Sequence, residues 1–387
     1  MNERDRLNWK FATKAIHVGQ ECDPLTGATV PPIHLTTTYT QQSPGKHKGF
    51  EYSRSQNPTR QALESCLAAL EEGSAAASFS SGSAASSAIL ATLAPGDQVL
   101  AYADVYGGTF RVMKHVFEAY GIVPVFTDDV SPASFADLAD ARTKMIWLES
   151  PTNPLLRCLD IQAIAGIAHE VGAKLVVDNT FATPALQRPL TLGADYVAHS
   201  TTKYIGGHSD VTGGAVIVRD EALLERIVFL QNSLGAVPGS LDCYLQQRGI
   251  KTLGVRMERH CHNATRVADT LRGHAKLASV VYPFAEDHPD RALARRQMSA
   301  GGGMVTMVFK EETRAIRFCE SLNVFSLAES LGGVESLCCH PAIMTHASIP
   351  KETREARGVT DGLVRLSVGI EDVDDLLADL DQALDQA

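Results

Sequence analysis

The sequence predicts an α/β protein with a mostly parallel sheet domain and a smaller C-terminal α+β domain. Between about residues 75 and 220, short apolar runs alternate with helical segments, which is typical of a parallel sheet with helices on both faces. Strand-like runs resume after about residue 273, again with helices between and after them. The length of 387 residues is compatible with two or three domains at roughly 150 residues each.

The first 55 residues are predicted to form an N-terminal arm rather than a domain. They contain few periodic apolar positions and several residues that interrupt regular structure, among them Pro31 and Pro32. A helix is predicted to begin after Asn57, which can cap it, with Pro58 in its first turn and Gly73 at its end. An arm of this kind is expected to lie against another surface, and the resemblance described below assigns that surface to a neighbouring subunit.

Residues 56–250 are predicted to form the large α/β domain, and residues 251–387 a connector helix with the small domain. Helices are expected at residues 107–121 and 161–173, and a helical connector at about 221–273. The strands expected in the large domain are 76–79, 98–104, 123–128, 145–150, 174–179, 196–200 and 214–218, and those in the small domain are 279–283, 304–310, 324–328 and 363–369.

Composition excludes several classes of protein. The formal net charge of −10 gives no overall attraction to nucleic acid or to anionic lipid, so neither is expected as a partner. The eight cysteines show no paired CxxC spacing, so neither a disulfide framework nor a structural zinc cluster is indicated. The first twenty residues lack the apolar core of a signal peptide, and no run reaches 18 apolar residues. We therefore expect a cytoplasmic protein.

The densest polar region follows two neighbouring strands. Asp178 comes directly after an apolar run, where a carboxylate needs a cationic partner. Ser200, Thr202 and Lys203 follow the next strand, and two hydroxyls beside a lysine suit a phosphate group. Lys203 has three interpretations: a solvated surface cation, a phosphate ligand, or an amine that forms a Schiff base after partial desolvation.

Pyridoxal 5'-phosphate would use all of these groups. It requires a lysine for its aldehyde, a carboxylate at its ring nitrogen, a phosphate site and usually an aromatic ring against its own. Gly82 and Ser83 lie where a strand gives way to a helix, so backbone N–H groups and the positive helix end can hold the phosphate. Tyr106 follows a strand and is placed to stack on the ring. Taken alone, residues 80–87 also fit a turn of small residues, and Tyr106 also fits a core position. The prediction rests on the order in which these segments, Asp178 and Lys203 occur along one chain.

The chain resembles the pyridoxal-phosphate-dependent cysteine and methionine metabolism family over nearly its whole length. Ten ordered motifs carry the resemblance: 51–60, 79–85, 104–111, 149–154, 176–184, 199–210, 231–239, 328–337, 341–350 and 365–372. It implies the aspartate aminotransferase-like PLP-transferase fold (fold type I), and a homotetramer built from active dimers.

The resemblance also implies roles for individual residues. Lys203 would bind the cofactor covalently, with Asp178 at the ring nitrogen and Tyr106 against the ring, and Gly82, Ser83, Ser200 and Thr202 would hold the phosphate. Tyr52 and Arg54 would reach the phosphate of the neighbouring subunit. Arg365 would bind the substrate α-carboxylate bidentately, assisted by Asn153 and Ser330, and Ser330 would also orient the lysine amine.

Among the family's activities, the resemblance favours γ-elimination of L-cystathionine to cysteine, 2-oxobutanoate and ammonia, with hydrogen sulfide released from cysteine or homocysteine. Glu51 and Glu329 match acidic positions that would recognise the distal ammonium of cystathionine; the alternative is that both are solvated surface carboxylates. Gly108, where methionine γ-lyases typically carry cysteine, disfavours that activity. The nearest alternative is γ-replacement on an O-acylated homoserine, which no single residue separates from the lyase reaction, and β-elimination is a weaker one.

Two alternatives come from other classes. His199, His208 and Asp210 could form the metal site of a hydrolase, but their spacing is not that of an HExxH motif and the cofactor motif already accounts for the segment. We therefore expect no metal. The second alternative, a protein that binds the cofactor without turnover, is disfavoured because Lys203, Tyr106 and Arg365 are all present. Cys338 and Cys339 lie between two of the ten motifs and are expected only to pack.

Overall fold

The computed structural model describes residues 8–347 and 350–387, so residues 348 and 349 of the motif 341–350 lie outside the described part. Its first sheet has seven strands in the order β1-β7-β6-β5-β4-β2-β3. β7 is antiparallel to its neighbours β1 and β6, and the remaining pairs are parallel. The predicted mostly parallel sheet is therefore confirmed. The strands are β1 (Ala75–Phe79), β2 (Gln98–Tyr102), β3 (Val123–Thr127), β4 (Thr143–Glu149), β5 (Lys174–Asp178), β6 (Tyr196–His199) and β7 (Gly214–Val218).

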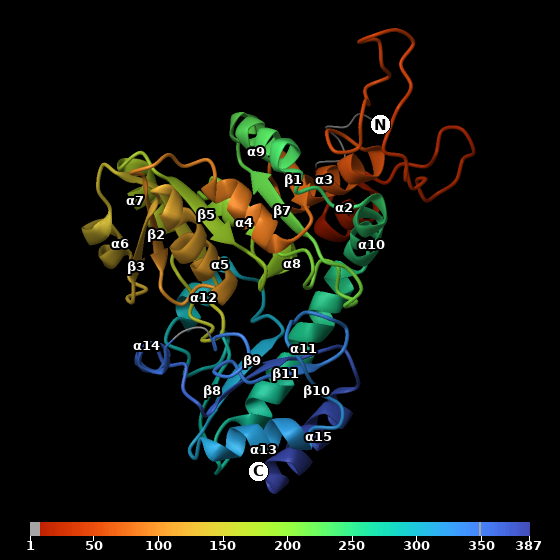
Figure 1. Cartoon of the computed structure of the whole chain (residues 1–387). Helices are drawn as coiled ribbons and strands as arrows, with labels where there is room; N and C mark the ends of the chain where they lie inside the picture. The colour runs from red at the N-terminus through yellow and green to blue at the C-terminus, as the bar shows by residue number, and fades with distance from the viewer. Residues whose placement is uncertain (1–7, 348–349) are drawn as a thin grey trace.

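Helices cover both faces of this sheet, as alternation along the strands requires (Figure 1). Leu148, Val177 and Val197 belong to the apolar cluster on the side of α3 and α7. Trp147, Val176 and Ala198 belong to the cluster on the side of α4 and α9. The helices are α3 (Pro58–Glu71), α4 (Gly82–Leu90), α5 (Gly107–Arg111), α6 (Pro132–Leu138), α7 (Ile161–Glu170), α8 (Thr183–Leu186) and α9 (Glu221–Leu234).

The second sheet has five strands in the order β10-β11-β12-β9-β8 and lies below the first in Figure 1. All its pairs are antiparallel except β10 with β11. Its apolar residues pack against α11, α13 and α15. The elements are α10 (Ser240–Ile250), α11 (Leu253–Leu271), β8 (Leu277–Val281), α12 (Arg291–Gln297), β9 (Met304–Phe309), α13 (Thr313–Ser321), β10 (Ser326–Leu327), β11 (Leu337–Cys339), α14 (Lys351–Ala356), β12 (Leu363–Ser367) and α15 (Val373–Gln386).

The N-terminal region contains one helix that the sequence did not predict, α2 (Phe11–His17). It is short and Lys10 gives it no side-chain cap, so it has no sequence signal of its own. Its Ala15 is buried in the same apolar cluster as residues of α3, which stabilises it. Beyond α2, residues 18–56 form loops that extend away from both sheets (Figure 1).

The start of α3 agrees with the prediction. The Asn57 side chain accepts hydrogen bonds from the backbone N–H groups of Thr59 and Arg60, and Pro58 is the first helical residue. The helix ends at Glu71. The next residue, Glu72, adopts the left-handed conformation in which a glycine is more usual, and Gly73 follows it. Gly73 is needed for space, since a Cβ there would lie 2.5 Å from Cγ2 of Ile217.

Two further predictions need correction, and one strand was not predicted. The predicted helix at 107–121 is α5, a π-helical segment (Val112–Phe117) and a 3₁₀ turn (Glu118–Tyr120). The predicted strand at 324–328 is reduced to two residues, and β11 was missed because its three residues are too few for an alternating pattern. In β11, Cys338 and Cys339 are both buried, and Cys338 packs in the small-domain core.

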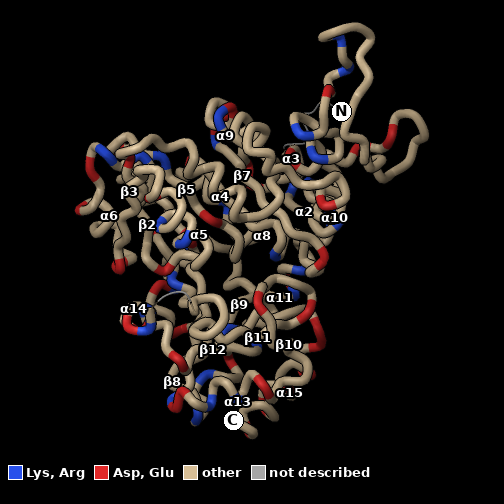
Figure 2. Tube along the Cα trace, viewed as in Figure 1, with Lys and Arg blue, Asp and Glu red and all other residues tan. Residues whose placement is uncertain are grey.

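Charged residues of both signs are interspersed along the trace (Figure 2). No helix in the described part of the chain is long and apolar enough to cross a membrane.

Candidate active site

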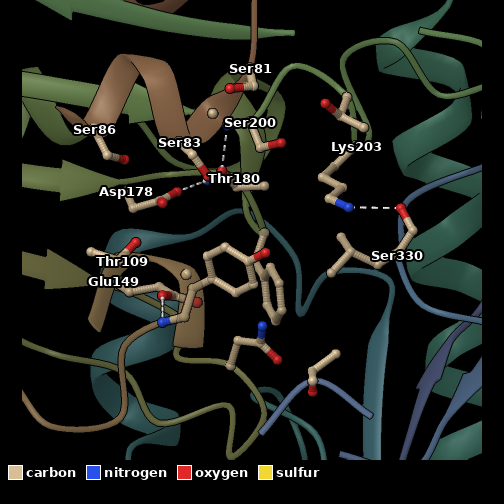
Figure 3. Close-up of a pocket in the computed structure, with 18 of the residues that line it drawn as sticks. Ser81, Ser83, Ser86, Thr109, Glu149, Asp178, Thr180, Ser200, Lys203 and Ser330 are labelled. Atoms are coloured by element: carbon tan, nitrogen blue, oxygen red, sulfur yellow. Dashed lines mark hydrogen bonds between the residues drawn. The ribbon is translucent and has the colours of Figure 1, made fainter. Parts of the chain in front are cut away.

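A pocket of about 310 Å³ lies at the carboxyl ends of the central strands of the first sheet, the usual place for a ligand in such a sheet (Figure 3). The second sheet closes it, because Arg365 of β12 also lines it. Eleven of the residues predicted for the site line this pocket: Gly82, Ser83, Tyr106, Asn153, Asp178, Ser200, Thr202, Lys203, Glu329, Ser330 and Arg365.

One end of the pocket is formed by the N-terminus of α4. Ser81 caps the helix through its hydroxyl, which accepts from Ala84 N at 3.0 Å. The amides of Gly82 and Ser83 have no acceptor within the helix, because the first helical N–H groups never do. At Gly82 a Cβ would lie 2.8 Å from the Cβ of Ser200, so glycine allows the helix end and the Ser200 strand to meet. These free amides form an anion site beside the Ser200 hydroxyl.

Asp178, the last residue of β5, lies in the wall of this pocket. Its Oδ1 accepts from Thr180 N at 3.0 Å (Figure 3). Burial raises the pKa of the Asp178 carboxyl above its ordinary value, and the Thr180 hydrogen bonds oppose that shift only partly. A carboxyl in this situation is stabilised as the anion by a cation, so its surroundings fit a protonated ring nitrogen.

Ser330 holds both Lys203 and Arg365, and Asn153, which follows β4 of the first sheet, also holds Arg365. Lys203 Nζ donates to Ser330 Oγ at 2.7 Å (Figure 3). Burial and then the charge of Arg365 lower the pKa of Lys203 from 10.5 to about 8. Arg365 donates from Nη1 to Asn153 Oδ1 at 2.7 Å and from Nη2 to the Ser330 carbonyl at 2.9 Å. The Arg365 Nε is buried without a hydrogen-bond partner, so the guanidinium retains a donor for an anionic ligand.

Tyr106 is positioned by Glu149, a pocket residue that the sequence analysis did not single out. Tyr106 N donates to Glu149 Oε2 at 2.7 Å, and the Tyr106 ring lies directly over Gly108. Burial and the neighbouring Asp178 hold the pKa of Glu149 well above its usual range. A signal was present in the sequence, since Glu149 is an acidic residue one position before the end of a predicted strand, as Asp178 is.

Other pocket residues were also missed. Thr180 donates its backbone N–H to Asp178, and its hydroxyl accepts from Ser200 N at 2.9 Å. These residues could have been found only because they are close in sequence to the predicted site residues. Their residue types give no signal, since hydroxyl and small residues are common in turns. The residues missed besides Glu149 and Thr180 are Ser81, Ser86, Thr109, Val112, Phe181, Thr212, Leu331 and Thr345.

Three predicted residues are not among those lining this pocket. Glu51 is exposed and lies 3.3 Å from His47, and Tyr52 is 44% exposed. Arg54 Nη1 donates to the carbonyl and to the side-chain oxygen of Asn232, each at 2.9 Å. All three belong to the loops that extend from the body of the chain (Figure 1). Tyr52 and Arg54 were predicted to reach the phosphate of a neighbouring subunit, and Glu51 to recognise the distal ammonium of the substrate. Both roles stay predictions.

The residues of the hydrolase alternative do not converge. His199 is buried and bonds to Glu71, whereas the His208 ring bonds to the carbonyl of Gly206 and Asp210 is exposed. Within residues 8–347 and 350–387, no group of three or more His, Cys, Asp or Glu side chains is arranged to hold a metal ion.

The fold and the pocket define a class: an enzyme of the PLP-dependent α/β type, with an anion site at a helix end, a buried carboxylate and a desolvated lysine around one cavity. The comparison with known families gives the same result. The chain belongs to the Cys/Met metabolism PLP-dependent enzyme family, whose model matches residues 12–385. Pyridoxal phosphate is therefore its cofactor.

Relatives at similar identity carry three different names. A cystathionine γ-synthase of Mycobacterium tuberculosis is 53% identical over 378 residues, with 96% of each chain covered. A cystathionine γ-lyase of Bos taurus is 50% identical over 380 residues, which cover 97% of this chain and 94% of the relative. A cystathionine β-lyase of Coxiella burnetii is 50% identical over 377 residues, which cover 96% and 97%.

The fold type is shown by a solved structure. The structure of cystathionine γ-lyase from Lactobacillus plantarum complexed with L-serine matches with a TM-score of 0.96 and 43% identity, over 98% of this chain and 99% of that one. The predicted fold type I PLP-transferase architecture is thereby confirmed. The chain belongs to a family of trans-sulfuration enzymes.

Proposed function

We propose that this protein is a cystathionine γ-lyase, which converts L-cystathionine and water to L-cysteine, 2-oxobutanoate and ammonia. The observation that carries the proposal is the grouping of Lys203, Arg365 and Glu329 around one pocket. Lys203 reaches the reacting carbons, Arg365 binds the α-carboxylate, and Glu329 binds the ammonium at the far end of the substrate. A substrate with an amino-acid group at each end uses all three.

Pyridoxal phosphate, when bound, supplies an aldehyde for the substrate amine and an electron-withdrawing ring that lowers the barrier to losing the Cα proton. Gly82, Ser83, Ser200 and Thr202 hold its phosphate in this proposal, and Asp178 pairs with the ring nitrogen. The chain's own residues then act on protons and charges.

Lys203 is the base that removes the Cα proton. Its pKa of about 8 means that a useful fraction of the amine is neutral near neutral pH. The Ser330 hydroxyl holds the amine at 2.7 Å and thereby fixes its direction. Arg365 holds the substrate carboxylate, so the Cα–H bond points at Lys203 and not at solvent.

A second proton leaves Cβ, and its electron pair forms a carbon–carbon double bond to Cγ as the Cγ–S bond breaks. The departing γ-thiolate needs a proton donor. The Tyr106 phenol and the protonated Lys203 are the candidates that line the pocket. The thiolate leaves as cysteine after protonation, and water then releases 2-oxobutanoate and ammonia from the remaining four-carbon fragment. The same groups would release hydrogen sulfide from homocysteine, whose γ-substituent is the thiol itself.

A second candidate, cystathionine γ-synthase, is favoured by one observation: the relatives at 53% identity carry that name. This enzyme would use the same pocket to join cysteine to an activated homoserine. Glu329 does not distinguish the two, because cystathionine is the substrate of one and the product of the other.

Product analysis with purified enzyme and L-cystathionine tests the proposal. Cysteine with 2-oxobutanoate supports γ-lyase activity. Homocysteine with pyruvate indicates β-elimination and contradicts the proposal. Slow cleavage combined with rapid formation of cystathionine from O-acylhomoserine and cysteine indicates the synthase and also contradicts it.

The role of Glu329 leads to a first prediction. Glu329→Gln, combined with Glu51→Gln, should raise KM for cystathionine about tenfold or more, because a charged hydrogen bond contributes about 1.5–3 kcal/mol. KM for homoserine, which has no distal ammonium, should change little. A control variant, Glu352→Gln, removes an exposed acid outside the pocket. Equal changes in both KM values would contradict the distal-ammonium role.

A further inference from the structure

A cluster of buried polar side chains lies beneath the first sheet, on the side opposite the pocket. We call it the under-sheet cluster: Glu71, Ser150, Asn179, Gln187 and His199. Each of these residues is at most 5% exposed, and none lines the pocket. The proposed reaction gives them no role.

Glu71, the last residue of α3, is the centre of the cluster. Its Oε1 accepts from Asn179 Nδ2 at 2.8 Å and from His199 Nε2 at 2.5 Å. Gln187 extends the connections: its Nε2 donates to Asn179 Oδ1 at 3.1 Å and to the Ser150 carbonyl at 2.8 Å. The cluster therefore connects the ends of three adjacent strands, β4, β5 and β6.

Three of the five cluster residues are next in sequence to a pocket residue. One member of each pair lines the pocket and the other is buried away from it. This arrangement continues the alternation of the strands, whose successive side chains point to opposite faces of the sheet. The apolar positions agree, since Val176 and Val177 belong to the clusters on different faces. The pairs are Glu149 with Ser150, Asp178 with Asn179, and Ser200 with His199.

The cluster acts at the carboxyl edge of the sheet, where the strand pairing comes to an end. β4 ends at Glu149, β5 at Asp178 and β6 at His199. Just beyond these residues two hydrogen bonds still tie β5 to β6, from Asn179 N to the Ala198 carbonyl at 3.0 Å and from Ser200 N to Thr180 Oγ1 at 2.9 Å. The pocket needs Asp178 and Ser200 at a fixed separation, and Glu71 adds a third tie through the side chains of Asn179 and His199, one at each of the two strand ends.

The under-sheet cluster is not an efficient way to stabilise the fold. The Oε2 of Glu71 and the Nδ1 of His199 are buried without a hydrogen-bond partner. Buried ionisable groups that lack partners cost free energy, and apolar residues of similar volume commonly stabilise a core as well or better. A role in positioning explains why such groups occupy this place.

We propose that Glu71 is a positioning residue for the cofactor. It fixes the distance between Asp178 and Ser200 from beneath the sheet, and so matches the pocket to a ligand that presents a ring nitrogen at one end and a phosphate at the other. The inference rests on the proposed roles of Asp178 and Ser200, but not on which reaction the enzyme catalyses.

The test measures affinity for pyridoxal phosphate in the apoenzyme, prepared by removing the cofactor from the full-length protein. Glu71→Ala deletes both hydrogen bonds, and Glu71→Gln retains an oxygen that accepts from Asn179 and His199. Glu72→Gln is the matched control, since Glu72 is the next residue but pairs at the surface with Arg188 at 3.0 Å. Titration followed by visible absorption gives the dissociation constant and the ratio of the absorption bands of the bound cofactor.

We expect Glu71→Ala to weaken binding at least about tenfold, a change of about 1.4 kcal/mol, and to alter the band ratio. Glu71→Gln should restore most of the affinity, and Glu72→Gln should match wild type. If Glu71→Ala lowers only the melting temperature of the apoenzyme and leaves affinity and band ratio as in Glu72→Gln, the role is structural and the proposal is wrong.

Should Glu71→Ala fail to fold, Gln187→Leu carries the test, because it removes the two hydrogen bonds to Asn179 and Ser150 but no charge. It should weaken cofactor binding in the same direction, and unchanged affinity would overturn the proposal. Asp178→Asn, measured in parallel, reports whether Asp178 contacts the cofactor at all. An enzyme that binds the cofactor but does not cleave cystathionine would contradict the proposed function and leave this inference intact.

Discussion

Lys203 illustrates how a residue's surroundings set its chemistry. Burial, reinforced by the charge of Arg365, lowers its pKa to about 8 in the folded chain, against 10.5 when it is solvated. Between these two values the unfolded chain holds a proton that the folded chain has lost. The free energy of unfolding therefore rises with pH through this window as far as Lys203 is concerned.

This leads to a second prediction. In the apoenzyme, wild type should gain stability relative to Lys203→Met as the pH rises from about 8 to 10.5, by on the order of 1–3 kcal/mol. Thermal or urea denaturation of both proteins across this range measures the difference. Tyrosines and cysteines that titrate in the same range contribute equally to the free energy of unfolding of both proteins, so their contributions cancel in the difference. A constant difference between pH 8 and 10.5 would show that Lys203 has an ordinary pKa.

Gly108 gives a third prediction, which concerns space. A Cβ at this position would lie 2.3 Å from Cε1 of Tyr106, so any side chain there must displace the ring. Gly108→Cys should lower kcat/KM for cystathionine about tenfold or more, equivalent to about 1.4 kcal/mol of barrier. The control is Gly166→Cys, since Gly166 lies within a helix and has open space around its missing Cβ. Equal kcat/KM in the two variants would mean that the Tyr106 ring position is unimportant.

At the scale of elements, α3 connects the arm with the ends of two strands. Its N-terminus holds the arm, because Asn57 Nδ2 donates to the His34 carbonyl at 2.9 Å and to Ser53 Oγ at 3.1 Å. Its C-terminus carries Glu71 into the under-sheet cluster. A helix that looks like a simple cover of the sheet thus relates the arm to the ends of β5 and β6.

A fourth prediction compares two helix caps. Asn57→Ala removes the cap of α3 together with its links to the arm, whereas Asp220→Ala removes only the cap of α9, which accepts from Ala222 N. A cap contributes about 1 kcal/mol, and each further buried hydrogen bond a similar amount. Asn57→Ala should therefore lower the melting temperature more than Asp220→Ala does, and should speed proteolysis within residues 18–56. Equal melting temperatures and proteolysis rates would contradict this role of Asn57.

At the scale of the whole molecule, the arm, as far as the structure describes it, has no packing partner within a single chain for several of its large apolar side chains. Its loops expose large apolar side chains, with Leu25 at 92% and Leu35 at 73% exposure. Tyr52 and Arg54, predicted to hold the cofactor phosphate, lie outside their own chain's pocket. Both observations fit an arm that packs on a second copy of the chain and completes its pocket.

Subunit complementation gives the fifth prediction. Arg54→Ala and Lys203→Ala are each expected to be inactive, but a hybrid dimer of the two holds one pocket with both residues intact if Arg54 acts across the interface. Random reassociation of the mixed variants should restore up to about a quarter of wild-type activity, since half of the dimers are hybrids and each has one intact pocket of two. No recovery, with hybrids verified by mass, would place Arg54 and Lys203 in the same subunit's site.

Much of the fold could be predicted from local sequence. The seven strands of the first sheet and the Asn57 cap of α3 follow from apolar runs and capping residues, both of which are local signals. The short elements could not be predicted: α2 and β11 have too few residues for a periodic pattern and are stabilised by packing. The domain boundaries at 55 and 250 stay predictions.

For the site, local sequence was enough to predict the residues that follow strands and helix starts, such as Asp178, Lys203 and Gly82, because their chemistry and their order are visible along the chain. Only the tertiary structure decided that Arg365 of the second sheet meets Asn153 of the first, that Glu149 supports Tyr106, and that Glu71 joins two strand ends from beneath. The physical reason is distance along the chain: these contacts join residues 43 to 212 positions apart, and no local pattern specifies which distant groups folding will bring together.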